Sequence, residues 1–166
     1  MPILKLILDI CLFRKGPEDV PASLILLVLA LLGYVLVGLL LLAFQAGLGM
    51  ALVQIVTEGA LSLVFLRLLL WTANKPHRFV QAAIALTGSD ALISLLALPL
   101  LSAQGIEGFA AVLYFPLLGM MIWHVAVFGM IFGRSISKPF PVGIAVALLY
   151  TLLSVQIMAK LFPAGV

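Results

Sequence analysis

The sequence predicts an all-α polytopic membrane protein, with five transmembrane helices preceded by an amphipathic helix at the membrane interface. Of its 166 residues, 65% are hydrophobic and only 9% are charged, and the mean hydropathy is +1.34. A soluble domain carries about 25% charged residues, so this chain is not suited to water. Five apolar segments are each long enough to cross a bilayer core of about 30 Å.

The first apolar segment, residues 3–13 (ILKLILDICLF), is too short to span the core. It is interrupted by Lys5 and Asp9, which share one helical face. We expect a helix that lies in the cytoplasmic interface with its apolar side chains in lipid. A proline-containing loop follows, which divides the chain into an interfacial part, residues 1–21, and a transmembrane domain, residues 22–166.

The five spans are predicted from uninterrupted apolar stretches, at residues 22–44, 48–73, 79–101, 109–133 and 142–162. The join between the first two, Gln45 to Gly47, is so short that these spans must form an antiparallel hairpin. Gly129 and Gly133 form a GxxxG pattern in the fourth span, which favours close approach of another helix.

Basic residues predict the orientation of the chain. Only Lys160 lies near one side of the membrane, and Arg67 is close enough to the other side to snorkel. The remaining basic residues all lie on that second side: Lys5, Arg14, Lys15, Lys75, Arg78, Arg134 and Lys138. The positive-inside rule therefore predicts a cytoplasmic N-terminus and an external C-terminus, which is periplasmic if the cell is bacterial. We expect a multi-pass protein of the cell inner membrane.

The third span is expected to be the hub of the fold because it places Asp90 in the middle of an apolar helix. A charge at the bilayer centre costs roughly 3 kcal/mol on insertion scales, so it should face protein or water. At helical spacing Asp90 lies on a narrow stripe of small and polar residues: Ala83, Thr87, Ser94 and Ala97. Such a stripe is typical of a helix buried in a membrane bundle.

Three ionisable residues lie deep in their spans at a similar depth: Glu58, Asp90 and His124. Two further stripes are predicted to face inward, one in the second span (Gly47, Ala51, Gln54, Glu58, Ser62) and one in the fifth (Gly143, Ala147, Tyr150, Ser154). The first span has no buried charge and is expected to lie outermost.

The functional interpretation of these three residues is a proton- or ion-handling cluster, because buried carboxylates and a histidine can exchange protons. The structural alternative is that they hydrogen-bond one another and set the helix register, each bond contributing about 0.6 kcal/mol. Metal binding by two carboxylates and a histidine is a third interpretation, but no fixed ligand spacing supports it, and we predict no metal.

The basic loops are candidates for contact with an anionic lipid or a partner protein, alongside the simpler role of setting topology. These candidates are Lys75, His77, Arg78, Arg134 and Lys138. Tyr34, Trp71, Tyr114 and Trp123 are interpreted as packing or belt aromatics.

Several functions lack the required residues. Cys11 is the single cysteine, which excludes an internal disulfide and a cysteine-built metal site. Nucleotide-binding, nucleophile-elbow and metalloprotease motifs are absent from the sequence, so we predict no cofactor and do not favour an enzyme. The basic residues lie at the membrane edges rather than in a patch, which argues against nucleic acid as a partner.

The chain has a short amphipathic segment followed by five spans, and this arrangement resembles that of the Yip-domain family of small polytopic membrane proteins. The resemblance extends to Lys75-Pro-His-Arg-Phe-Val-Gln-Ala at the start of the third span, and to Trp123, Gly129 and Ser135 in the fourth. It implies a non-enzymatic membrane adaptor, and no site residues carry over. Glu18-Asp19 resembles the acidic cytosolic motif of eukaryotic members only faintly.

Three functional hypotheses follow. The first is a non-enzymatic adaptor or accessory subunit of a larger inner-membrane assembly, with a membrane-protein partner or a second copy of itself. The alternative is a small proton- or ion-coupled transporter or channel component that uses Glu58, Asp90 and His124. A bilayer-embedded enzyme acting on lipid is the least favoured.

Overall fold

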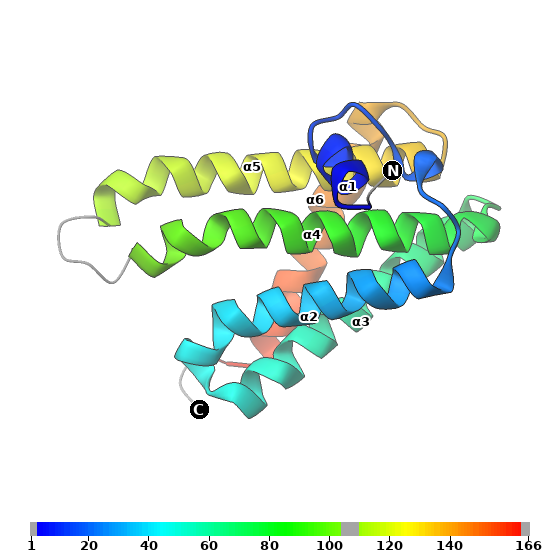
Figure 1. Cartoon of the computed structure of the whole chain (residues 1–166). Helices are drawn as coiled ribbons and strands as arrows, with labels where there is room; N and C mark the ends of the chain where they lie inside the picture. The colour runs from blue at the N-terminus through cyan, green and yellow to red at the C-terminus, as the bar shows by residue number, and fades with distance from the viewer. Residues whose placement is uncertain (1–2, 104–109, 164–166) are drawn as a thin grey trace.

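The computed structural model, which describes residues 3–103 and 110–163, is a bundle of helices (Figure 1). Five described helices are long and apolar enough to cross a membrane, which confirms the predicted fold class. The helices are α1 (Ile3–Cys11), α2 (Leu24–Ala46), α3 (Leu48–Thr72), α4 (Phe79–Ser102), α5 (Ala110–Ser135) and α6 (Phe140–Leu161). Short 3-10 turns precede α2 and α4, namely η1 (Pro17–Asp19) and η2 (Pro76–Arg78).

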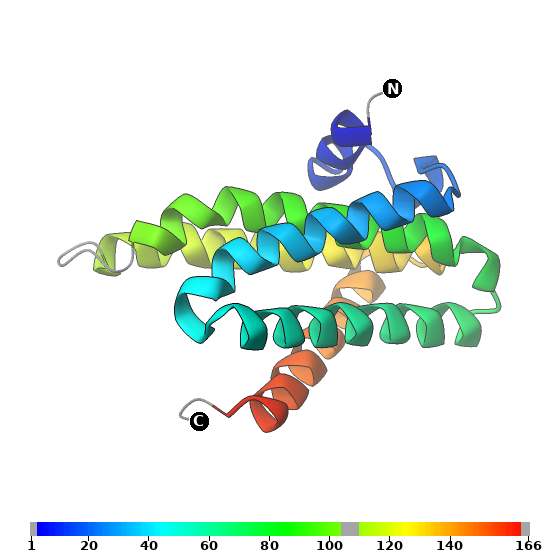
Figure 2. The ribbon, with the colours of Figure 1, turned by 60° about the horizontal axis from the view of Figure 1, so that its bottom comes forward.

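The predicted span boundaries agree with these helices to within two residues. The expected start of the fourth span at residue 109, and most of the loop before it, lie outside the described residues. The hairpin of α2 and α3 is confirmed: Gly47 alone separates the two helices, which lie side by side (Figure 2). Its φ of 72° is a left-handed conformation that glycine adopts without steric cost.

Helix α4 is the hub of the bundle, as the sequence predicts. It packs against α1, α2, α3 and α5 and against both 3-10 turns. Every residue from Ala82 to Thr87 is buried, so this part of the helix is surrounded on all sides. Small side chains such as Ala82 and Ala85 let neighbouring helices approach closely, which is how membrane helices associate.

The closest helix crossing joins α5 to α6 and is built from glycines. A Cβ atom on Gly143 of α6 would lie 1.9 Å from the carbonyl oxygen of Gly129 and 2.9 Å from the Cα of Gly133. The GxxxG pattern in α5 therefore does mark a close contact. The buried residues of α6 are the predicted inward stripe: Gly143, Ala147, Tyr150 and Ser154.

Helix α2 has no fully buried residue in its most apolar stretch, consistent with the expected outermost position. It nevertheless packs on both α3 and α4 of its own chain. Helix α6 runs at a steep angle to the other long helices and packs chiefly on α5 (Figure 2).

Helix α1 differs from the expectation in two ways. It ends at Cys11 rather than at residue 13, because Phe13 adopts a left-handed conformation with φ of 60° that the helix cannot continue through. Its apolar face does not lie wholly in lipid: the buried residues pack on α4, while Leu4 and Leu8 remain exposed. The residues buried in this contact are Leu6, Ile7, Ile10 and Cys11.

Three segments meet at one end of the bundle: the N-terminal segment (residues 3–23), the α3–α4 turn and the α5–α6 turn. We call this the basic end; it carries Arg14, Lys15, Lys75, Arg78, Arg134 and Lys138. The segments are joined there by the edge-to-face rings of Phe13 and Phe140, with centroids 6.3 Å apart. A hydrogen bond of 2.8 Å from Gln81 Nε2 to the Val20 carbonyl adds a further link.

Candidate functional site

The structure brings Asp90 and His124 into contact in the middle of the bundle. Asp90 lies eleven residues after the first residue of α4, and His124 lies eleven residues before the last residue of α5. Both of those helix ends are at the basic end, so at a rise of 1.5 Å per residue the two side chains lie at the same depth. His124 Nε2 is 3.2 Å from Asp90 Oδ1.

This contact places a histidine and a carboxylate where charge is expensive. The two side chains are only partly shielded, with 36% of the His124 side chain and 23% of the Asp90 side chain exposed. Within the described chain, Nε2 has no well-aligned hydrogen-bond partner, so the contact is defined by distance, and it is an ion pair when His124 is protonated. Whether the proton resides on the imidazole or on the carboxylate, the pair has no net charge, which limits the cost of burial.

Glu58 lies in the same cavity, which has a volume of about 300 Å³. Each of the five long helices contributes at least one polar side chain to its wall: Tyr34, Glu58, Asp90, Ser94, His124 and Tyr150. At about 30 Å³ for each molecule in the liquid, the cavity has room for several waters and has polar partners for them. The side chains that the sequence groups by depth therefore line one cavity, whose other wall residues are mostly apolar.

Glu58 differs from Asp90 in its surroundings. The buried stripe of α3 runs through Ala51, Ile55, Gly59, Ser62, Leu66 and Leu70, whereas Glu58 itself is exposed. The predicted inward stripe is thus correct at Ala51 and Ser62 and wrong at Gly47, which is exposed, and at Gln54, which is only half-buried. Glu58 lines the cavity from the edge of the packed face.

Two cavity residues, Tyr34 and Tyr150, were not among the predicted site residues. Gly59 explains the position of Tyr34, because a Cβ atom there would lie 2.9 Å from the Tyr34 ring. The available signal was depth: Tyr34 lies ten residues after the start of α2, far from the interface where belt tyrosines gather. A buried tyrosine hydroxyl needs a polar partner, which such a cavity can provide.

An aromatic cluster lies on the basic-end side of the cavity. It consists of Phe65, Phe128, Phe132 and Tyr150, whose ring centroids lie 5.2 to 6.1 Å apart. Phe128 also packs edge-on against the His124 ring at 4.3 Å. Phe132 is fully buried and Phe128 nearly so, and both lie between His124 and the basic-end terminus of α5. In the opposite direction the cavity wall continues to Leu101, near the end of α4.

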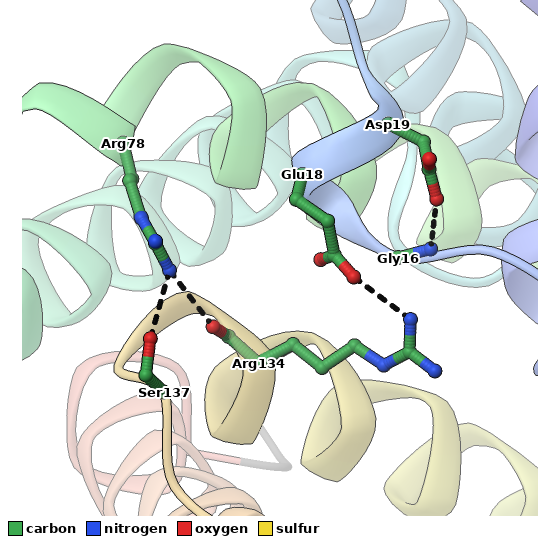
Figure 3. A network of polar contacts seen from close by, with 6 residues as sticks. All are labelled: Gly16, Glu18, Asp19, Arg78, Arg134 and Ser137. Atoms are coloured by element: carbon green, nitrogen blue, oxygen red, sulfur yellow. Dashed lines mark hydrogen bonds and ion pairs between the residues drawn. The ribbon is translucent and has the colours of Figure 1, made fainter.

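The five basic-loop candidates do not form one site. Lys75 Nζ donates a hydrogen bond to Ser137 Oγ, and His77 is exposed. Arg78 Nη1 donates to the carbonyl oxygen of Arg134 at 3.2 Å (Figure 3) and to that of Ser135 at 3.3 Å, and so caps the last turn of α5. These contacts tie the α3–α4 turn to the α5–α6 turn.

The other two candidates, Arg134 and Lys138, line a groove at the basic end. Arg134 also forms an ion pair with Glu18 of η1, with an Nη1–Oε1 distance of 2.8 Å (Figure 3). This pair holds the N-terminal segment against the end of α5. Trp123 does the same deeper in the bundle, where its Nε1 donates to the Cys11 carbonyl oxygen at 2.9 Å.

Among the described residues, no group of three histidine, cysteine, aspartate or glutamate side chains is arranged to hold a metal ion. Glu58, Asp90 and His124 share a cavity wall rather than a single coordination sphere. Comparisons with protein-family models, curated proteins and solved structures give no match to this chain.

Proposed function

We propose that this protein binds and transfers protons or a small cation within the membrane, through the cavity lined by Glu58, Asp90 and His124. The observation that carries the proposal is the convergence of polar side chains from all five apolar helices on a single cavity. Polar groups inside a bilayer are costly, so their gathering at one place favours a shared task over separate packing roles.

The chemistry of the chamber fits proton exchange. A histidine has an unperturbed pKa near 6.5 and is the side chain whose charge changes most readily near neutral pH. With Asp90 3.2 Å away, a proton on the pair can move between imidazole and carboxylate without a net charge entering the apolar interior. Glu58 lines the same cavity from the edge of the packed face, and in this proposal it passes a proton or cation between the pair and the rest of the cavity.

Access to the chamber is unequal on its two sides. The aromatic cluster of Phe65, Phe128, Phe132 and Tyr150 lies towards the basic end, whereas the cavity wall extends away from it to Leu101. If the basic end is cytoplasmic, as its charges favour, the cavity faces the periplasm. A transport cycle then requires the rings of the cluster to move apart, since they exclude water from the cytoplasmic side.

Proton flux into proteoliposomes that contain a pH-sensitive dye tests the proposal. Asp90→Asn and His124→Gln should each lower the flux by about 100-fold, the lower range of what a positioned acid–base group contributes to proton transfer. Asp9→Asn is the matched control, because it removes a carboxylate in α1 and should leave the flux unchanged. Equal flux in wild type and Asp90→Asn, or no flux in either under any cation gradient tested, rejects the proposal.

A second candidate is the accessory subunit or adaptor of a larger inner-membrane assembly, the role that the Yip-domain resemblance implies. It is favoured by α6, which diverges from the other long helices (Figure 2) and has an exposed apolar face. The exposed residues on that face include Leu148, Leu152 and Val155. Purification in mild detergent with mass spectrometry of co-eluting chains tests this role; a solitary monomer counts against it.

A further inference from the structure

A second site, separate from the mid-membrane cavity, lies at the basic end. It is an open groove of about 600 Å³ between the end of the N-terminal segment and the α5–α6 turn. Its lining divides by chemistry: Arg134 and Lys138 are cationic, while Phe13, Met130 and Phe140 are apolar. We propose that this groove binds an anionic phospholipid from the adjacent membrane leaflet. The lipid phosphate contacts Arg134 and Lys138, and the part of the acyl chain nearest the head group contacts the apolar lining residues.

Charge is the first argument for this occupant. Arg134 and Lys138 are both exposed, and the side chain of Lys138 forms no ion pair among the described residues. An arginine guanidinium presents several N–H donors to phosphate oxygens, and a lysine ammonium adds a mobile point charge. Each basic residue near an anionic membrane surface adds about 1 kcal/mol of attraction.

Position is the second argument. Arg134 lies in the last turn of α5, and Lys138 lies in the short turn before α6 begins at Phe140, so both cations are at the level where a spanning helix leaves the apolar core. Phe13 and Phe140 pack edge-to-face there, with exposed fractions of 40% and 47%. Cations directly beside exposed apolar rings fit an amphiphile better than an acidic protein segment, which would leave the rings uncovered.

The structure also separates these two cations from the other basic residues. Lys75 and Arg78 are engaged with Ser137 and the end of α5, and neither lines the groove. Arg134 is partly neutralised by Glu18 at 2.8 Å. Removing the charge of Glu18 should therefore strengthen lipid binding, because the full charge of Arg134 is then available to a phosphate.

Binding can be measured by titrating the detergent-solubilised full chain with phosphatidylglycerol or phosphatidylcholine and counting bound lipids by native mass spectrometry. Wild type should bind one phosphatidylglycerol in preference to phosphatidylcholine. Lys138→Gln and Arg134→Gln should each weaken that binding by about fivefold, the factor that corresponds to about 1 kcal/mol. Glu18→Gln should strengthen it.

Arg14→Gln is the matched control, since it removes one exposed positive charge at the same end without altering the groove lining. It should leave the affinity for phosphatidylglycerol within twofold of wild type. The assignment is overturned if the two lipids bind equally, in which case an acidic protein partner becomes the better occupant. It is also overturned if Arg14→Gln loses as much affinity as Lys138→Gln, because general surface attraction then accounts for the binding. Lys138→Gln keeps the test decisive if Arg134→Gln disturbs the fold.

Discussion

Cys11 shows how a single residue reports the docking of α1 on α4. Only 1% of its surface is exposed, and its thiol lies beside the hydroxyl of Ser89, which is fully buried. Burial raises the pKa of the Cys11 thiol above its ordinary value, and the Ser89 contact offsets this only in part. The thiolate, which is the nucleophilic form, is therefore scarce at neutral pH.

We predict that Cys11 in the folded protein reacts with maleimide at least about tenfold more slowly than an exposed cysteine, the factor for a local opening of about 1.4 kcal/mol. Leu12→Cys in a Cys11→Ala background is the matched control, because Leu12 is the next residue and is 51% exposed. The rate at Cys11 should increase only as the pH rises through the raised pKa. Labelling at equal rates would mean that α1 is not docked.

At the scale of the helix, the α5–α6 crossing depends on the absence of side chains. A methyl group on Gly143 would meet the backbone of Gly129, which cannot move aside as the end of a flexible side chain can. Overpacking of this kind typically costs 1–3 kcal/mol.

Gly143→Ala is therefore predicted to lower the midpoint of thermal unfolding in detergent, with a destabilisation at or above about 3 kcal/mol. Gly119→Ala in α5 is the control, because a Cβ atom there has open space within 4 Å. Its effect should be neutral or slightly stabilising, since alanine is the better helix former. If Gly143→Ala and Gly119→Ala had the same midpoint of thermal unfolding, close packing would not explain the glycine pattern.

The sequence was most informative about the helices and least informative about how their faces meet. Apolar run length defined all five spans, and the small-residue stripe of α6 was correct at each position. On α3 the expected stripe was partly wrong. The buried face of this helix includes Ile55 and Gly59, and the pattern of polar residues does not reveal that these two face inward.

The cavity was predictable only through its charges. Glu58, Asp90 and His124 could be grouped by depth, since each interrupts an apolar span. The aromatic cluster could not, because aromatic residues are common throughout membrane helices and their meeting depends on the three-dimensional arrangement of three spans. The apolar face of α1 could not be assigned to protein or lipid, since both are equally apolar environments.

For the whole molecule, the gathering of the basic residues predicts orientation. Three separate turns and loops bring their cations to one end of the bundle, and Arg67, within α3, directs its guanidinium over the Phe79 ring at the start of α4, 5.5 Å from the centroid. Moving this end to the periplasm would oppose the charge bias that sets membrane topology.

We predict that alkaline phosphatase fused after Val166 is active in a bacterial host, whereas green fluorescent protein fused there is dark. The same reporters fused after Asn74, in the α3–α4 turn, should give the reverse result and serve as the control. Fluorescence from the C-terminal fusion would contradict the proposed orientation. It would also mean that the cavity faces the cytoplasm rather than the periplasm.

The tethering of the N-terminal segment has a consequence for biogenesis. Cys11 and Glu18 are bonded to residues 112 and 116 positions later in the chain, both in α5. Neither bond can form until translation has reached α5, the fourth of the five spans. Helix α1 can pack on α4 before then, but its attachment to α5 must wait until four of the five spans have been synthesised.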